Sequence, residues 1–97
     1  MTNKTGYVYL MMNSTNSVLY TGVTSNLKNR VDQHKERSIK GFTERYHVTK
    51  LVYFETFEYV RDAIVREKQI KAGSRAKKIE LIKTLNPELR DLYEEII

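Results

Sequence analysis

Tyrosines cluster near the start of the chain, in two short stretches that could bring phenol groups together. Tyr7 and Tyr9 alternate within Gly6–Met12 (GYVYLMM), and Tyr20 lies within Ser17–Val23 (SVLYTGV). Both stretches are rich in β-branched and aromatic residues and flank a polar turn, which predicts a β-hairpin. A symmetric turn would place Tyr9 directly opposite Tyr20, with both phenols on one face of the sheet. Taken alone, such a pair is also typical of strand tyrosines that only pack and hydrogen-bond.

The next candidate pair is Arg30 and His34, which lie four residues apart in a helix predicted from Leu27 to about Lys35. Leu27 and Val31 define its buried side, and at about 100° per residue Arg30 and His34 fall within roughly 60° of Leu27. Both side chains are therefore expected to lean toward the sheet. A boundary arginine and a satisfied core histidine would give the same pattern without any chemistry.

Glu67 interrupts the apolar side of a longer helix predicted over residues 58–72. Burying an ionised carboxylate costs several kcal/mol unless a cation or strong donors compensate it. Glu67 therefore requires Arg30, Lys71 or a metal ion as a partner, and an ordinary salt bridge to Lys71 four residues later is the structural alternative. The apolar positions around Glu67 are Val60, Ala63, Ile64 and Ile70.

Positive charge is concentrated in the second half of the chain. The whole sequence carries a formal net charge of +5 and has an isoelectric point near 9.5, which favours a polyanionic partner such as nucleic acid. Six cations within sixteen residues could form a phosphate-contacting surface, although a solvated helix face explains them as well. These cations are Lys68, Lys71, Arg75, Lys77, Lys78 and Lys83.

Length and composition restrict the classes of protein. Ninety-seven residues predict one domain over 1–97. The absence of cysteine excludes disulfides, thiolate metal sites and thiol nucleophiles. No apolar run approaches the ~20 residues of a membrane-spanning helix, and no secretory signal is visible, so we expect a cytoplasmic protein without a membrane partner.

The remaining elements complete an α+β architecture. Lys50–Glu55 (KLVYFE) predicts a third strand, and Ser74 is expected to cap a helix that ends at Leu85. Asn86, followed by Pro87, is expected to cap a short last helix. The predicted order is β-β-α-β-α-α-α, with a small three-stranded antiparallel sheet flanked by helices.

These stretches, taken in order, resemble the GIY-YIG endonuclease family, and most closely its small single-domain bacterial members. Tyr7-Val8-Tyr9 stands where the family has Gly-Ile-Tyr, and Tyr20-Thr21-Gly22 stands where it has Tyr-Ile-Gly. Arg30, His34, Glu67 and Asn86 match the later residues of the pattern. The chain departs from it at Tyr7, at Thr21 and at Leu89, where small members often have tryptophan.

The resemblance implies hydrolysis of DNA phosphodiester bonds with one Mg²⁺ or Mn²⁺ ion, in DNA repair or recombination. Glu67 would hold the metal, and Asn86 would fix the phosphate or the geometry of the metal site. Tyr20 or Tyr9 would position and deprotonate the attacking water. Because a free phenol has a pKa near 10, either Arg30 and the metal must lower it or His34 must accept the proton. Arg30 would also stabilise the transition-state phosphate.

Two other functions remain open at this point. A nucleic-acid-binding module with the same fold but little or no turnover would also carry the basic charge. A protein-interaction domain would need neither DNA affinity nor a metal. The resemblance also leaves the assembly open between a monomer and a weak homodimer.

Overall fold

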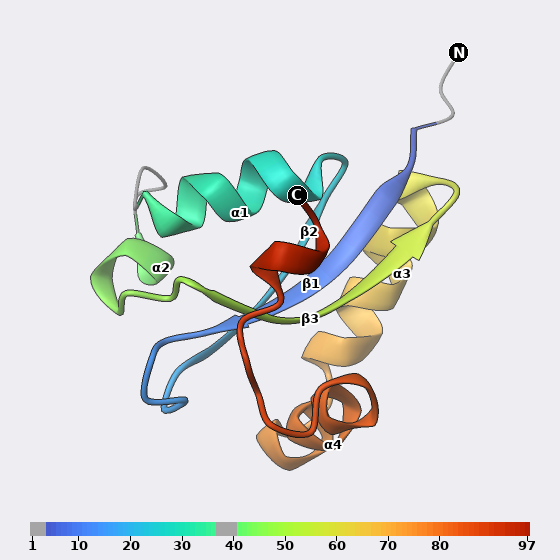
Figure 1. The fold of residues 1–97 in the computed structure, drawn as a ribbon. Coiled ribbons are helices and arrows are strands. Elements are labelled where there is room, and N and C mark those ends of the chain that lie inside the picture. The colour runs from blue at the N-terminus through green and yellow to red at the C-terminus, as the bar shows by residue number, and fades with distance from the viewer. Residues whose placement is uncertain (1–3, 37–40) are drawn as a thin grey trace.

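A three-stranded antiparallel sheet forms the centre of the molecule, seen here in a computed structural model that describes residues 4–36 and 41–97. The strand order is β2-β1-β3, so the first strand lies in the middle (Figure 1). The α+β prediction with an antiparallel sheet and flanking helices is confirmed. The elements are β1 (Gly6–Met12), β2 (Leu19–Thr24), α1 (Leu27–Lys35), α2 (Phe42–Arg45), β3 (Lys50–Phe57), α3 (Val60–Lys71), α4 (Arg75–Leu85) and a 3₁₀ turn (Tyr93–Glu95).

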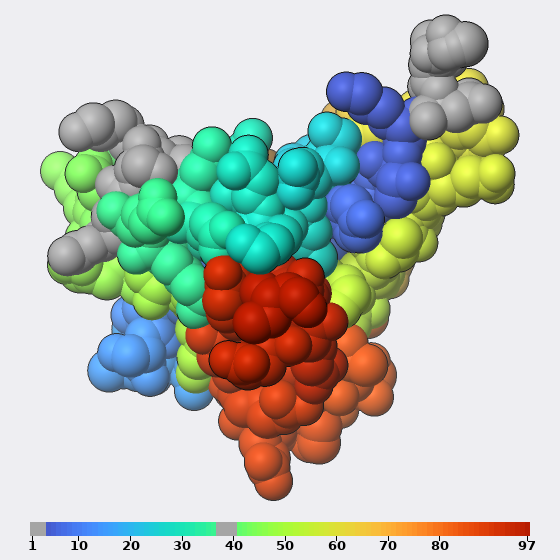
Figure 2. Space-filling model, turned by 45° about the horizontal axis from the view of Figure 1, so that its top comes forward, coloured from blue at the N-terminus to red at the C-terminus, as the bar shows by residue number. Residues whose placement is uncertain are grey.

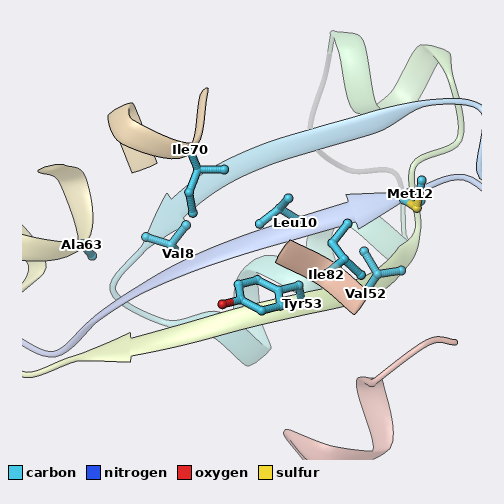
Figure 3. Close-up of a cluster of buried hydrophobic side chains, with 8 residues drawn as sticks. All are labelled: Val8, Leu10, Met12, Val52, Tyr53, Ala63, Ile70 and Ile82. Carbon is cyan, nitrogen blue, oxygen red and sulfur yellow. The ribbon is translucent and has the colours of Figure 1, made fainter. Parts of the chain in front are cut away.

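Helices cover both faces of the sheet, and β1 contributes side chains to each (Figure 1). Val8, Leu10 and Met12 point to the face covered by α3 and α4, where they pack in a hydrophobic cluster (Figure 3). Tyr9 and Met11 point to the opposite face, which α1 and the C-terminal segment cover. This alternation follows from the two-residue repeat of a strand, and it separates two different environments.

The hairpin prediction holds in its strands, but the predicted register is wrong by two residues. Tyr9 pairs with Gly22, and Tyr20 pairs with Met11. The reason is an asymmetric turn in which the Asn13 side chain accepts hydrogen bonds from the backbone of Ser17 and Val18, at 2.9 and 3.0 Å. Strand β2 therefore begins only at Leu19. Because the shift is even, the two tyrosines still share one face, as predicted.

Two of the helices begin at residues whose side chains cap the first turn. Asn26 accepts a hydrogen bond from the backbone of Asn29 at 3.1 Å and begins α1, and Ser74 does the same for Lys77 at 3.1 Å and begins α4. Helix α2 was not predicted, because only four residues form it. No helix in the described ranges is long and apolar enough to cross a membrane.

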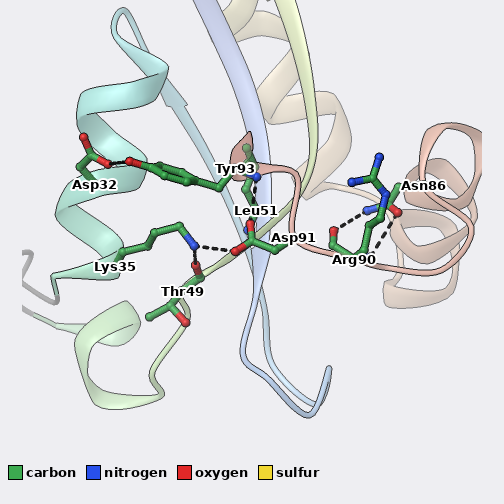
Figure 4. Close-up of polar contacts among 8 residues, drawn as sticks. All are labelled: Asp32, Lys35, Thr49, Leu51, Asn86, Arg90, Asp91 and Tyr93. Carbon is green, nitrogen blue, oxygen red and sulfur yellow. Dashed lines mark hydrogen bonds and ion pairs between the residues drawn. The ribbon is translucent and has the colours of Figure 1, made fainter. Parts of the chain in front are cut away.

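The predicted last helix is wrong, and only a short 3₁₀ turn forms there. Asn86 ends α4 instead of beginning another helix, and Leu89 adopts a positive φ of 56° that turns the chain away. The segment after it returns to the sheet, where Leu92 donates a backbone hydrogen bond to Leu51 at 2.7 Å. Asp91 accepts from the Leu51 amide at 3.1 Å and from the Lys35 ammonium at 2.5 Å (Figure 4). Figure 2 shows this C-terminal segment packed against α1.

Candidate active site at the β2 edge of the sheet

Tyr9 and His34 form the buried part of the candidate site. Tyr9 is fully buried and His34 is 2% exposed. The Tyr9 hydroxyl and His34 Nε2 lie 3.0 Å apart and share a hydrogen bond. The bond joins the central strand to α1, so both side chains are fixed by packing. The expectation that His34 leans toward the sheet is confirmed.

Tyr20 lies beside this pair and is only partly buried. Its ring centroid is 6.2 Å from that of Tyr9 and 5.5 Å from that of His34. Gly22 makes this packing possible, because a Cβ atom there would lie 2.5 Å from the Tyr9 hydroxyl. The tyrosine pair, the histidine and the glycine of the second motif are thus parts of one arrangement.

Burial keeps both members of the Tyr9–His34 pair uncharged at neutral pH. Desolvation, followed by the nearby Tyr20, raises the pKa of Tyr9 far above its usual value, and Arg30 opposes this rise. Desolvation, and then the positive charge of Arg30, lowers the pKa of His34 to about 4. His34 Nδ1 is buried and has no hydrogen-bond partner among the residues that the structure describes. Tyr9 is therefore a poor base in this environment, whereas His34 stays unprotonated and can accept a hydrogen bond.

Glu67 lies on α3 and is 8% exposed, as its place among apolar residues predicts. Its partner is Lys71, whose ammonium is 2.8 Å from the Glu67 carboxylate. Of the three compensations considered, the structure therefore provides the lysine. This hydrogen bond raises the pKa of Lys71, and a smaller contribution in the same direction comes from Tyr20. Lys71 consequently links the carboxylate to the tyrosine at the edge of the sheet.

A pocket of about 290 Å³ opens at this edge, where β2, α2, α3 and α4 meet. Its lining includes two aromatic and two lysine side chains. It is lined by Leu19, Tyr20, Thr21, Phe42, Lys71 and Lys78.

The residues around Glu67 suit a magnesium or manganese ion that keeps most of its ligands from solvent and substrate. Within 4–36 and 41–97, no group of three or more histidine, acidic or cysteine side chains converges on one point. Mg²⁺ is commonly held by one or two carboxylates together with waters and substrate phosphate oxygens. A single carboxylate beside an exposed lysine fits that arrangement.

Asn86 is buried, and its side-chain amide forms hydrogen bonds with backbone groups. Its nitrogen donates to the carbonyls of Val52 at 3.0 Å and Arg90 at 2.8 Å, and its oxygen accepts from the Arg90 amide at 3.2 Å (Figure 4). Both amide protons are therefore engaged. Asn86 fastens the end of α4 to β3, and the predicted helix-capping role is wrong.

The predicted nucleic-acid surface contains cations in two different situations. Arg75 donates to the backbone of Asn16 at 2.7 Å, and Lys78 donates to the backbone of Gly73 at 2.9 Å. Lys68 and Lys77 are exposed, and no hydrogen bond or ion pair of their ammonium groups occurs within the described ranges. Lys71 is held by Glu67. The cations are thus partly structural and partly available to a ligand.

Two aromatic residues beside the pocket were missed by the sequence interpretation. Phe42 is 49% exposed and stacks toward Tyr20, with ring centroids 6.2 Å apart. Tyr46 is 43% exposed, and its ring centroid is 4.9 Å from that of Phe42. Their four-residue spacing in Gly41–Tyr46 (GFTERY) was the available sign, because this spacing places two side chains on one side of a helical turn.

The chain is similar to a known domain family and to several known proteins. The family described as GIY-YIG catalytic domain matches residues 5–80. A UPF0213 protein of Clostridium perfringens is 38% identical over 90 residues, covering 93% of this chain and 96% of the relative. A UPF0213 protein of Pediococcus pentosaceus is 32% identical over 87 residues, covering 90% and 92%.

A solved structure shares the fold as well. The solution NMR structure of a UPF0213 protein from Bacillus halodurans matches with a TM-score of 0.56 and 26% sequence identity, over 87% of this chain and 88% of that one. The match to the family covers both tyrosine motifs, α1 and Glu67. The chain therefore belongs to the GIY-YIG nuclease family.

Proposed function

We propose that this protein is a metal-dependent endonuclease that hydrolyses DNA phosphodiester bonds, with a role in DNA repair or recombination. One observation carries the proposal: the side chains of Tyr9, Tyr20 and His34 are packed together beside Arg30. Two tyrosines and a histidine that lie close together near an arginine, with Tyr20 lining a pocket, can orient water and stabilise a phosphate. In addition, His34 Nδ1 is buried without a partner among the described residues. Because buried polar atoms are usually hydrogen-bonded, packing alone does not explain this histidine.

In this proposal Tyr20 orients the attacking water, because it is the tyrosine that lines the pocket. Tyr9 stays protonated and acts as a hydrogen-bonding bridge between Tyr20 and His34. His34 is unprotonated at neutral pH and accepts the hydrogen bond at the end of this chain. We therefore assign the general base to Tyr20, which takes the proton of the water while its own proton passes through Tyr9 to His34 Nε2.

Arg30 and Glu67 provide the opposite charges of the site. The Arg30 guanidinium, which lies close enough to affect both Tyr9 and His34, stabilises the negative charge that develops on the phosphate. Glu67 holds one Mg²⁺ or Mn²⁺ ion, and Lys71 compensates its charge when no ion is bound. When bound, the ion supplies electrostatic stabilisation of the phosphate and its leaving oxygen.

The test is cleavage of branched, nicked, linear and single-stranded DNA by the purified protein with Mg²⁺ or Mn²⁺. We expect cleavage by the wild type and a loss of at least about 100-fold in Glu67→Gln and in Tyr20→Phe, the usual scale for acid–base and electrostatic groups. Glu80→Gln and Tyr59→Phe serve as matched controls outside the pocket and should retain activity.

Salt-sensitive binding without cleavage would contradict this proposal and favour the inactive binding module. We expect a monomer or a weak homodimer, and size-exclusion chromatography with light scattering measures which of the two forms. Failure to bind any DNA or RNA at low salt would instead favour a protein-interaction domain.

A further inference from the structure

A row of three aromatic rings leads from the candidate site to the surface. Tyr20, Phe42 and Tyr46 follow one another with centroid distances of 6.2 and 4.9 Å. The interplanar angle between Tyr20 and Phe42 is 29°, which is close to a stacked arrangement. Phe42 and Tyr46 are both among the exposed large apolar side chains of the described chain. Exposing such rings to water is unfavourable, so covering them with a ligand would contribute favourably to the free energy of binding.

The pocket beside these rings also contains positively charged side chains. Lys71 and Lys78 line the pocket together with Tyr20 and Phe42. The Lys71 side chain is 57% exposed although it is paired with Glu67, and Lys78 is tied only to backbone carbonyls. A ligand in this pocket would therefore meet both aromatic rings and lysine side chains. A nucleotide has both complementary parts, a flat base and an anionic phosphate.

We infer that Phe42, supported by Tyr46, is a stacking platform for the base of an unpaired nucleotide whose phosphate lies against Lys71 and Lys78. This inference rests on the proposed nuclease function and specifies its substrate as DNA with unpaired nucleotides beside the cleaved bond. Because every base has an aromatic face, the platform selects for unpaired strands and not for a particular sequence. In a regular duplex both faces of an internal base are already stacked, so it must first be unstacked to use this platform.

The first experiment measures stacking directly. The chain contains no tryptophan, so Phe42→Trp introduces the only indole and reports on its own surroundings. In EDTA, where cleavage is suppressed, we expect a 12-nucleotide oligothymidylate to quench this fluorescence. The same thymidylate strand paired with oligoadenylate should quench it at least several-fold more weakly at equal concentration and salt, since its bases are not free to stack.

The second experiment measures what the ring contributes to binding. Phe42→Ala should weaken binding of the oligothymidylate by about 5- to 100-fold, the usual effect of removing one stacking ring. Duplex binding should change by less than about twofold, because phosphate contacts dominate it. Phe42→Trp should restore single-strand binding, and Val65→Ala, which removes an exposed apolar side chain of α3, is the matched control. Tyr46→Ala gives an independent second variant, and circular dichroism verifies that each variant is folded.

The inference is overturned if Phe42→Ala binds the single strand as tightly as the wild type, or if single-strand and duplex binding weaken equally. Either result leaves the nuclease proposal intact, provided that Glu67→Gln still abolishes cleavage. Conversely, selective loss of single-strand binding with no cleavage by the wild type supports the platform and contradicts the nuclease. Binding of neither strand form by the wild type overturns both.

Discussion

The central strand β1 contributes side chains to both faces of the sheet, and their surroundings on the two faces differ. On the α3–α4 face, Leu10 packs among hydrophobic side chains and makes no polar contact. On the α1 face, the adjacent residue Tyr9 is equally buried but hydrogen-bonds to His34. Around Leu10 the buried side chains are hydrophobic and supply stability, whereas around Tyr9 part of that stability is given up to bury a polar cluster. The contrast teaches that complete burial alone does not identify a residue as structural.

The largest effect on folding is expected from the α3–α4 face. Leu10→Ala should lower the free energy of unfolding by about 2–5 kcal/mol, because it leaves a cavity at a fully buried position. Urea denaturation followed by circular dichroism measures this change. Under conditions in which the variant remains folded, its nuclease activity should be close to wild type, and a specific loss of activity there would break the distinction between the faces.

A pH effect should come from the opposite face. The pKa of His34 is about 4 in the folded protein against about 6.5 when unfolded, so the unfolded state binds more protons between these values. The contribution of His34 to stability is therefore fully present above about pH 6.5, and it is lost as pH falls toward 4. The loss should reach up to roughly 3 kcal/mol.

Urea denaturation between pH 4 and 7.5 measures this effect. His34→Asn should reduce the dependence of stability on pH in this range, because it removes the imidazole whose pKa folding lowers. An unaltered profile in His34→Asn would show that another group is responsible.

A smaller effect on stability is expected at the hydroxyl of Tyr9. Tyr9→Phe removes the partner of His34 Nε2 and leaves both ring nitrogens without a protein partner, at a cost of about 1–3 kcal/mol. Its effect on cleavage should exceed that of Leu10→Ala when both are assayed in their folded state. Thermal unfolding and a cleavage assay on the same samples test this, and equal loss of activity in both variants would remove the contrast.

The smallest effect should come from the C-terminal segment that covers the α1 face. The Tyr93 hydroxyl hydrogen-bonds to Asp32 near the surface (Figure 4). Tyr93→Phe should cost about 0.5–1.5 kcal/mol, the net value of one such bond. Thermal unfolding detects the shift, and Tyr59→Phe, whose hydroxyl makes no hydrogen bond within the described ranges, is the control. A cost above that of Tyr9→Phe would indicate that the segment, and not the cluster, stabilises this face.

The amino-acid sequence by itself determined the main elements and the face on which most candidate residues lie. Alternating apolar and aromatic residues fixed the strands, and Ser74 fixed the start of one helix, because these are local preferences of the backbone. The burial of Glu67 and His34 also followed from helical periodicity.

Tertiary structure alone decided the strand register, the role of Asn86 and the aromatic row at the pocket. The turn register depends on which backbone groups the Asn13 side chain engages, and Asn86 is held by carbonyls that lie far apart in the sequence. Phe42 reaches Tyr20 only because the chain brings α2 back to the edge of β2. Such contacts between distant segments have no local pattern, since they depend on how all the elements pack at once.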